Sequence, residues 1–144
     1  EELKTIVSWA ERPFIIKGVM TARGAEKALE AGASGIVVSN HGGRVLDHCP
    51  ATAEVLPEIA DAVGGKMTIF VDGAVRSGMD IFKALALGAD AVLIGRPFVT
   101  AVYGGGEEGV QCYVQKLKAE LADTMRMCGA HSLAEIDRSM IYHG

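Results

Sequence analysis

The sequence has 144 residues, of which 49% are hydrophobic and 22% are charged, and its formal net charge is −4 at pH 7. This balance is typical of a folded globular domain. It argues against disorder, a nucleic-acid partner or membrane insertion, because no basic run exceeds a pair and no apolar stretch could span a bilayer. The three cysteines are widely spaced, which predicts free thiols in a cytoplasmic protein, with neither a disulfide framework nor a metal site.

Helical and strand-like segments alternate along the chain. In chain order the expected elements are a helix at 1–10, a strand at 14–16, a helix at 21–31, a strand at 36–38, a helix at 52–63, a strand at 68–71, a helix at 77–87, a strand at 91–94 and, after three glycines, a long helix at 107–127. The strands are short continuous apolar runs, as is typical of buried parallel strands. Four such strands, each followed by a helix, predict an α/β fold of parallel βα units.

The chain also contains an internal repeat at an offset of 56 residues. The matching pairs are Phe14 with Phe70, Val19 with Val75, Lys27-Ala28-Leu29 with Lys83-Ala84-Leu85, and Gly32-Ala33 with Gly88-Ala89. Two copies of a βαβ unit at this spacing suit half of a (β/α)₈ barrel, which needs roughly 250 residues. A complete, small, doubly wound sheet is the alternative.

Groups that can carry chemistry follow each expected strand. They are Lys17-Gly18, Ser39-Asn40-His41, Asp72-Gly73-Ala74 and Gly95-Arg96. Barrel active sites lie at the carboxyl ends of the strands, so these groups are expected to meet. Histidine has an unperturbed pKa suited to proton transfer near neutrality, and arginine grips a carboxylate with two hydrogen bonds. His41 and Arg44 therefore suggest chemistry on the carbon next to an acid group, unless they form an ordinary surface turn.

The last two strand ends also suggest a phosphate site. Gly73 and Gly95 allow close approach of the backbone, and Arg76 and Arg96 supply positive charge. Read singly, Asp72 could be a helix cap and Lys17 a solvated side chain, as those residue types often are.

Five segments together carry a family resemblance. They are Lys17-Gly18-Val19, Ser39-Asn40-His41-Gly42-Gly43-Arg44, Asp72-Gly73-Ala74-Val75-Arg76, Phe82-Lys83-Ala84-Leu85-Ala86-Leu87-Gly88-Ala89 and Gly95-Arg96-Pro97. In this order they resemble the FMN-dependent α-hydroxy-acid oxidase and dehydrogenase family, which includes glycolate oxidase, lactate oxidase and the flavin-linked L-lactate dehydrogenases. Ala74 departs from the pattern, since the family usually has a second glycine there.

The resemblance implies an FMN enzyme that oxidises an L-2-hydroxy acid, of the lactate or glycolate type, to the 2-keto acid. His41 would be the catalytic base, and His41 and Arg44 would bind the small hydroxy-acid substrate. Cofactor contacts would come from the following residues: Lys17, Ser39, Asp72, Gly73, Ala74, Val75, Arg76, Gly95 and Arg96. The hydroxy acid and the electron acceptor remain open, because the residues that select them lie mostly outside this sequence.

The resemblance also implies that residues 1–144 are the C-terminal half of a (β/α)₈ barrel. The expected partner is the missing N-terminal half or a second copy of the chain, giving an oligomer that closes the open strand edges. Two other interpretations stay open. The isolated chain could be an inert half-barrel that binds FMN, phosphate or only a partner. Alternatively, it could belong to a different FMN- or phosphate-binding barrel, such as the inosine-phosphate dehydrogenases or type 2 isopentenyl-diphosphate isomerases.

Overall fold

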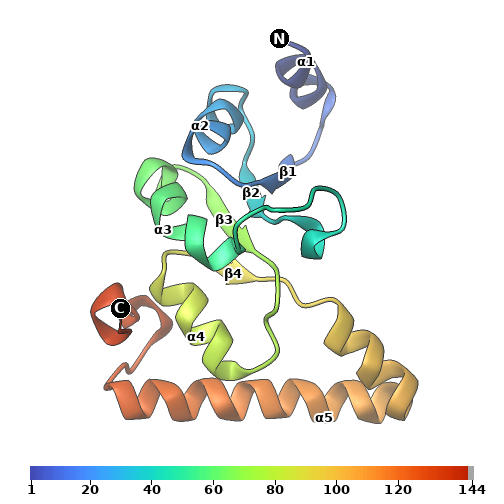
Figure 1. Cartoon of the computed structure of the whole chain (residues 1–144), viewed down its shortest axis with the longest axis vertical. Helices are drawn as coiled ribbons and strands as arrows, with labels where there is room; N and C mark the ends of the chain where they lie inside the picture. Colours follow the sequence, from blue (N-terminus) through green and yellow to red (C-terminus); the bar gives the residue numbers. More distant parts are fainter. Residues whose placement is uncertain (143–144) are drawn as a thin grey trace.

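The computed structural model describes residues 1–142 and contains a four-stranded parallel sheet with the strand order β1-β2-β3-β4. The strands are β1 (Ile15–Val19), β2 (Gly35–Val38), β3 (Thr68–Val71) and β4 (Ala91–Val92). The helices are α1 (Glu2–Trp9), α2 (Ala22–Glu30), α3 (Thr52–Val63), α4 (Gly78–Ala86) and α5 (Arg96–Cys128), with 3₁₀ turns η1 (His41–Gly43), η2 (Leu133–Glu135) and η3 (Arg138–Met140). Each strand leads into a helix, and α2, α3 and α4 follow one another along the sheet (Figure 1).

The register of the sheet separates its two faces. Ile16, Ile36 and Ile69 are paired across three strands and belong to the main core beneath α2, α3 and α4. Alternate residues of a strand point to the opposite face. That face is covered unevenly: Ile15 on the edge strand is 46% exposed, whereas Val37 on the neighbouring strand is 5% exposed. The helices therefore bury one face of a curved sheet, as in one half of a barrel.

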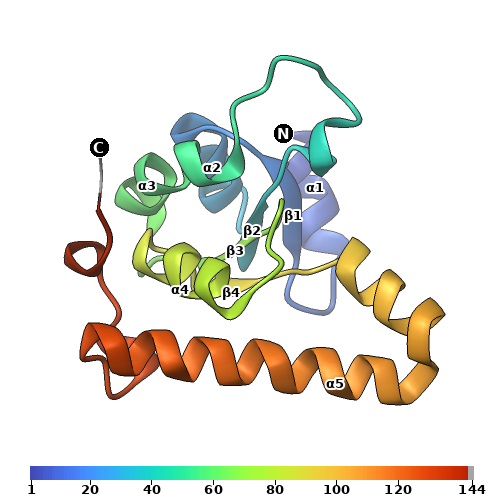
Figure 2. The same cartoon turned by 60° about the horizontal axis from the view of Figure 1, so that its bottom comes forward.

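The C-terminal helix α5 differs most from the expectation. A loop was predicted through Gly104–Gly106, but the helix begins at Arg96 and consists of two legs, 96–105 and 107–128, that meet at Gly106 (φ 55°, ψ −134°). Figure 2 shows the sharp turn between the legs. Pro97 lies in the first turn, where a missing N–H is tolerated. Glycine lowers helix stability without forbidding a helix, which explains why Gly104 and Gly105 do not interrupt the first leg.

Two strand predictions were wrong in their bounds. Strand β1 extends to Val19 and so includes Lys17, because the ladder resumes after an irregularity at Gly18 (φ 93°). Strand β4 ends at Val92 instead of residue 94, although the Leu93 N–H still donates to the Val71 carbonyl at 2.9 Å. None of the helices within residues 1–142 is long and apolar enough to cross a membrane.

Candidate active site

Lys17 joins the carboxyl ends of three neighbouring strands. Its ammonium lies 2.9 Å from a carboxylate oxygen of Asp72 and donates a 2.7 Å hydrogen bond to the Ser39 hydroxyl. The Lys17 side chain is 50% exposed and that of Asp72 is 21% exposed. The other carboxylate oxygen, Asp72 Oδ1, is buried and has no hydrogen-bond partner among the described residues. Buried acceptors are nearly always paired, so this oxygen is available to accept a hydrogen bond from a ligand or from a further part of the protein.

His41 lies in a strained turn directly after β2. Its backbone has φ 57°, which is uncommon for a residue other than glycine, and its N–H donates to Ser39 Oγ at 3.1 Å. The Asn40 side chain caps the same turn by accepting from the Gly43 N–H at 3.2 Å. Strain of this kind is often found at functional sites, where the surrounding structure maintains it. The turn leaves His41 exposed at the carboxyl end of β2.

The loop after β3 packs its backbone closely against Thr52. Gly73 has φ 103°, and a Cβ atom there would lie 2.8 Å from Thr52 Oγ1. That hydroxyl donates to the Asp72 carbonyl at 2.7 Å and so fixes the start of the loop. Ala74 has φ 58°, a left-handed conformation that glycine adopts more readily.

The end of the same loop is closed by the carboxylate of Asp80. It accepts hydrogen bonds from the backbone N–H groups of Arg76 and Ser77, each at 3.0 Å, and from the Ser77 hydroxyl at 2.9 Å. Burial by itself would raise the pKa of Asp80, but these donors, with Lys83 nearby, outweigh it and lower the pKa below its ordinary value. The carboxylate is therefore charged at neutral pH and holds the loop against the first turn of α4.

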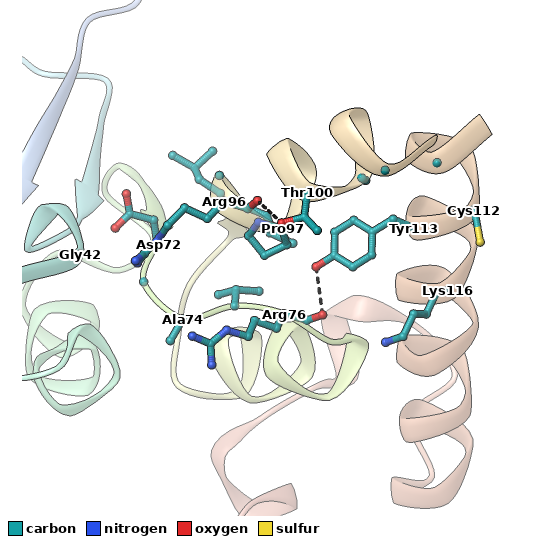
Figure 3. A pocket seen from close by; sticks show the side chains of 18 of the residues that line it. Gly42, Asp72, Ala74, Arg76, Arg96, Pro97, Thr100, Cys112, Tyr113 and Lys116 are labelled. Carbon is teal, nitrogen blue, oxygen red and sulfur yellow. Dashed lines mark hydrogen bonds between the residues drawn. The ribbon is translucent and has the colours of Figure 1, made fainter. Parts of the chain in front are cut away.

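A cavity of about 900 Å³ lies between these loops and α5. The predicted residues that line it are His41, Arg44, Asp72, Gly73, Ala74, Val75, Arg76, Gly95 and Arg96. Lys17 and Ser39 are not among the lining residues but are joined to them through Asp72. Figure 3 shows the Arg96 side chain extending toward Gly42, where an added Cβ would lie 3.0 Å from the Arg96 guanidinium.

Sequence reasoning missed several residues of this site. Thr52 was interpreted only as the start of a helix, although its hydroxyl supports the loop at Gly73. The outer wall of the cavity includes Cys112, Tyr113 and Lys116 on the long leg of α5. Their helical spacing is visible in the sequence, but nothing in it indicates that this leg folds back across the strand ends.

Comparison with known proteins identifies the class. The family described as FMN-dependent dehydrogenase matches residues 1–143. The chain is 49% identical over 139 residues to glycolate oxidase 3 of Oryza sativa subsp. indica. The matched segment covers 96% of this chain and 37% of that protein. It is 45% identical over 141 residues to a peroxisomal (S)-2-hydroxyacid oxidase of Arabidopsis thaliana, covering 98% of this chain and 39% of the relative.

Solved structures give the same result. The chain is 42% identical to a mandelate oxidase variant with the monooxide FMN adduct, with a TM-score of 0.91 over 94% of this chain and 43% of that chain. A mandelate oxidase with benzoyl-formic acid matches with a TM-score of 0.90 at the same identity, over 94% of this chain and 41% of that chain. The chain therefore spans about two fifths of the length of these proteins.

The chain belongs to the FMN-dependent dehydrogenase family. The predicted fold, the C-terminal half of a (β/α)₈ barrel, is confirmed, and so is FMN as the cofactor of the family. Family membership also favours a hydroxy-acid enzyme over the alternative of a different barrel. The roles of the individual residues, L-lactate as a substrate and a cytoplasmic location stay predictions.

Proposed function

We propose that the full-length protein oxidises a small L-2-hydroxy acid to the 2-keto acid with FMN as cofactor. The observation that carries this proposal is the arrangement of one wall of the cavity. The wall combines an exposed imidazole in a strained turn, an arginine three residues later, and the carboxylate of Asp72, which is paired with Lys17 just outside the lining residues. The names of the relatives, which include glycolate and mandelate oxidases, support the 2-hydroxy-acid class.

His41 and Arg44 would act on the substrate. Arg44 would bind the carboxylate with its planar guanidinium, which fixes the neighbouring carbon beside the imidazole. His41 would accept a substrate proton as the hydroxyl carbon is oxidised, a role that histidine fills most often among side chains. The substrate loses two electrons and two protons in total, and FMN, when bound, supplies the two-electron acceptor.

The residues of the cavity fit FMN. The buried Asp72 Oδ1 can accept a hydrogen bond, and a Cβ atom on Gly95 would meet nothing within 4 Å, so the backbone there is open to a ligand. Arg76 and Arg96 would bind the phosphate, and Lys17 would place positive charge beside the flavin ring. Ser39, Ala74 and Val75 complete the proposed contacts.

The partner of this chain is proposed to be the N-terminal half of the barrel. Strands β1 and β4 are the two edges of the sheet, and parallel edges that carry partly exposed apolar side chains are prone to pair with other strands. The length of the relatives is consistent with a segment of the required size, because this chain covers 37–39% of the two relatives described above. A second copy of the chain is the competing partner.

The test uses a protein that contains both halves of the barrel, either as one chain or as two mixed chains. Substitution His41→Gln should lower kcat for a 2-hydroxy acid by at least about 10²-fold, since general bases contribute roughly 10²–10⁴. The flavin absorption band should remain after desalting. His48→Gln is the matched control, because His48 lies in the following loop with the same φ of 57° and a side chain that is 95% exposed.

Two results would contradict the proposal. Turnover that survives His41→Gln would exclude His41 as the base. Turnover that the chain supports equally well with and without the N-terminal half would exclude that half as the required partner.

A further inference from the structure

A tyrosine on the long leg of α5 bonds to the loop after β3. The hydroxyl of Tyr113 donates a hydrogen bond to the backbone carbonyl of Arg76 at 2.9 Å (Figure 3). Its ring packs edge-to-face against Phe98 of the short leg, with ring centroids 5.0 Å apart and planes at 72°. Tyr113 therefore links both legs of α5 to the loop that would hold the phosphate of FMN.

A second contact fixes α5 relative to α4. Glu120, two helical turns after Tyr113 and on the same face, accepts a hydrogen bond from the Gly78 N–H at 2.9 Å. The helices are so close there that a Cβ atom on Gly78 would lie 2.2 Å from the backbone nitrogen of Leu121. This close contact leaves α5 little freedom to shift, so the Tyr113 hydroxyl is held in place by the packing of the helices.

The backbone of Arg76 is held on both sides. Its N–H donates to Asp80 and its carbonyl accepts from Tyr113, while its guanidinium points away from Tyr113 along the cavity (Figure 3). Burial raises the pKa of the Tyr113 hydroxyl; Lys116 lowers it, and Glu120 and Asp80 raise it further. The hydroxyl is thus a proton donor throughout the physiological pH range.

We propose that Tyr113 is a positioning residue for the phosphate end of FMN. By fixing the carbonyl of Arg76, it holds the Arg76 guanidinium in the orientation that binds the phosphate. This inference rests on the proposed function, because it takes the same cavity as the FMN site. Without the hydroxyl, the loop samples other orientations, in which Arg76 does not face the phosphate. The affinity for FMN then falls in proportion to the fraction of molecules that keep Arg76 in the binding orientation.

The experiment compares Tyr113→Phe with the unmodified sequence, each in the protein that contains both halves of the barrel, in titrations with FMN and with riboflavin followed by flavin fluorescence. Riboflavin lacks the phosphate and reports the rest of the site. The Kd for FMN should rise about 3- to 10-fold, as expected for one lost hydrogen bond, and the Kd for riboflavin should change less than about 2-fold. Tyr103→Phe is the matched control, since Tyr103 lies on the short leg of α5 and is 90% exposed.

The outcomes separate the two proposals. An unchanged Kd for FMN in Tyr113→Phe, or equal losses for FMN and riboflavin, overturns the positioning role while leaving the cofactor site intact. Unmodified protein with both halves that binds FMN no more tightly than riboflavin overturns the phosphate site itself, and the positioning role with it. Phenylalanine retains the ring contact with Phe98, so the variant removes only the hydroxyl.

Discussion

The two copies of the internal repeat, residues 14–33 and 70–89, build the same βα unit with different surroundings. Thr21 and Ser77 cap their helices in the same way, each accepting from the N–H three residues later, at 3.0 and 3.1 Å. Each helix also ends with the same bond, from Ala33 to Ala28 and from Ala89 to Ala84, both at 3.1 Å. The local structure is therefore set by a short pattern of capping and glycine residues that occurs twice.

The second copy is more tightly constrained than the first. Its cap includes the carboxylate of Asp80, where the first copy has Gly24, and its helix is covered by α5. Its closing glycine, Gly88, packs against α3, whereas Gly32 faces Val7 of α1 with more space. One of the added contacts, the Asp80 carboxylate, bonds directly to the loop proposed to bind phosphate, so that loop belongs to the more constrained copy.

The largest difference between the copies should appear at the closing glycines. In Gly88→Ala the new Cβ would lie 2.5 Å from the Ala60 Cβ, at a φ of 106°. Steric overlap and the left-handed backbone together should lower the free energy of unfolding by about 3–4 kcal/mol. In Gly32→Ala the Cβ would lie 3.5 Å from Val7, an ordinary contact, so only the backbone strain of about 1–2 kcal/mol remains.

Urea denaturation of the two variants measures this difference directly. Equal losses would show that the packing of the second copy against α3 is looser than the contacts indicate. A larger loss for Gly32→Ala would reverse the comparison and make the first copy the more constrained one.

Substitution of the capping residues should reveal a smaller, pH-dependent difference in stability between the two copies. Removing either hydroxyl with Thr21→Ala or Ser77→Ala should lower the free energy of unfolding by about 1 kcal/mol. At pH 7 the loss should be greater for Ser77→Ala, because the Ser77 hydroxyl also donates to the charged Asp80. The pKa of Asp80 is lower in the folded protein than in the unfolded chain, so its stabilising effect is complete above about pH 4 and is lost as the pH falls through the folded-state pKa.

The excess loss for Ser77→Ala over Thr21→Ala should therefore shrink in acid. Denaturation curves of both variants and the unmodified chain at pH 7 and below pH 4 test this expectation. An excess that stays constant between those pH values would mean that the Asp80 carboxylate contributes nothing to the cap.

Local patterns predicted this fold well wherever one residue type determines the conformation. The expected helices that start at Thr21 and Ser77 and the apolar strands at 36–38 and 68–71 predicted the βα order and the strand ends at which the site lies. The loop predicted at 104–106 was wrong for Gly104 and Gly105, because glycine is compatible with both a loop and a helix and the residue type alone does not decide between them.

The site was predictable to the extent that it lies at strand ends. His41, Arg44, Asp72 and Arg96 follow strands, and the topology of parallel βα units brings such residues to one edge. The contribution of Tyr113 was not predictable, since it depends on the path of α5 after its turn at Gly106. Contacts made by tertiary packing between distant segments leave no periodic signal in the sequence.

The smallest difference between the copies concerns two equivalent positions, Gly18 and Ala74, at the carboxyl ends of β1 and β3. Gly18 in the first copy and Ala74 in the second are equivalent in the repeat, and both have positive φ, 93° and 58°. Gly18→Ala should lower the free energy of unfolding by about 1 kcal/mol, because its Cβ would meet nothing within 4 Å and only backbone strain is added. Ala74→Gly should raise the free energy of unfolding by about 0.5 kcal/mol, since relief of that strain exceeds the extra entropy that glycine gives the unfolded chain.

Urea denaturation measures both changes. A loss of stability in Gly18→Ala together with a gain in Ala74→Gly would support a conformation shared by the two copies. A loss of stability in Ala74→Gly would instead mean that the Ala74 methyl group makes contacts that outweigh its strain, and that alanine is the better residue for this loop.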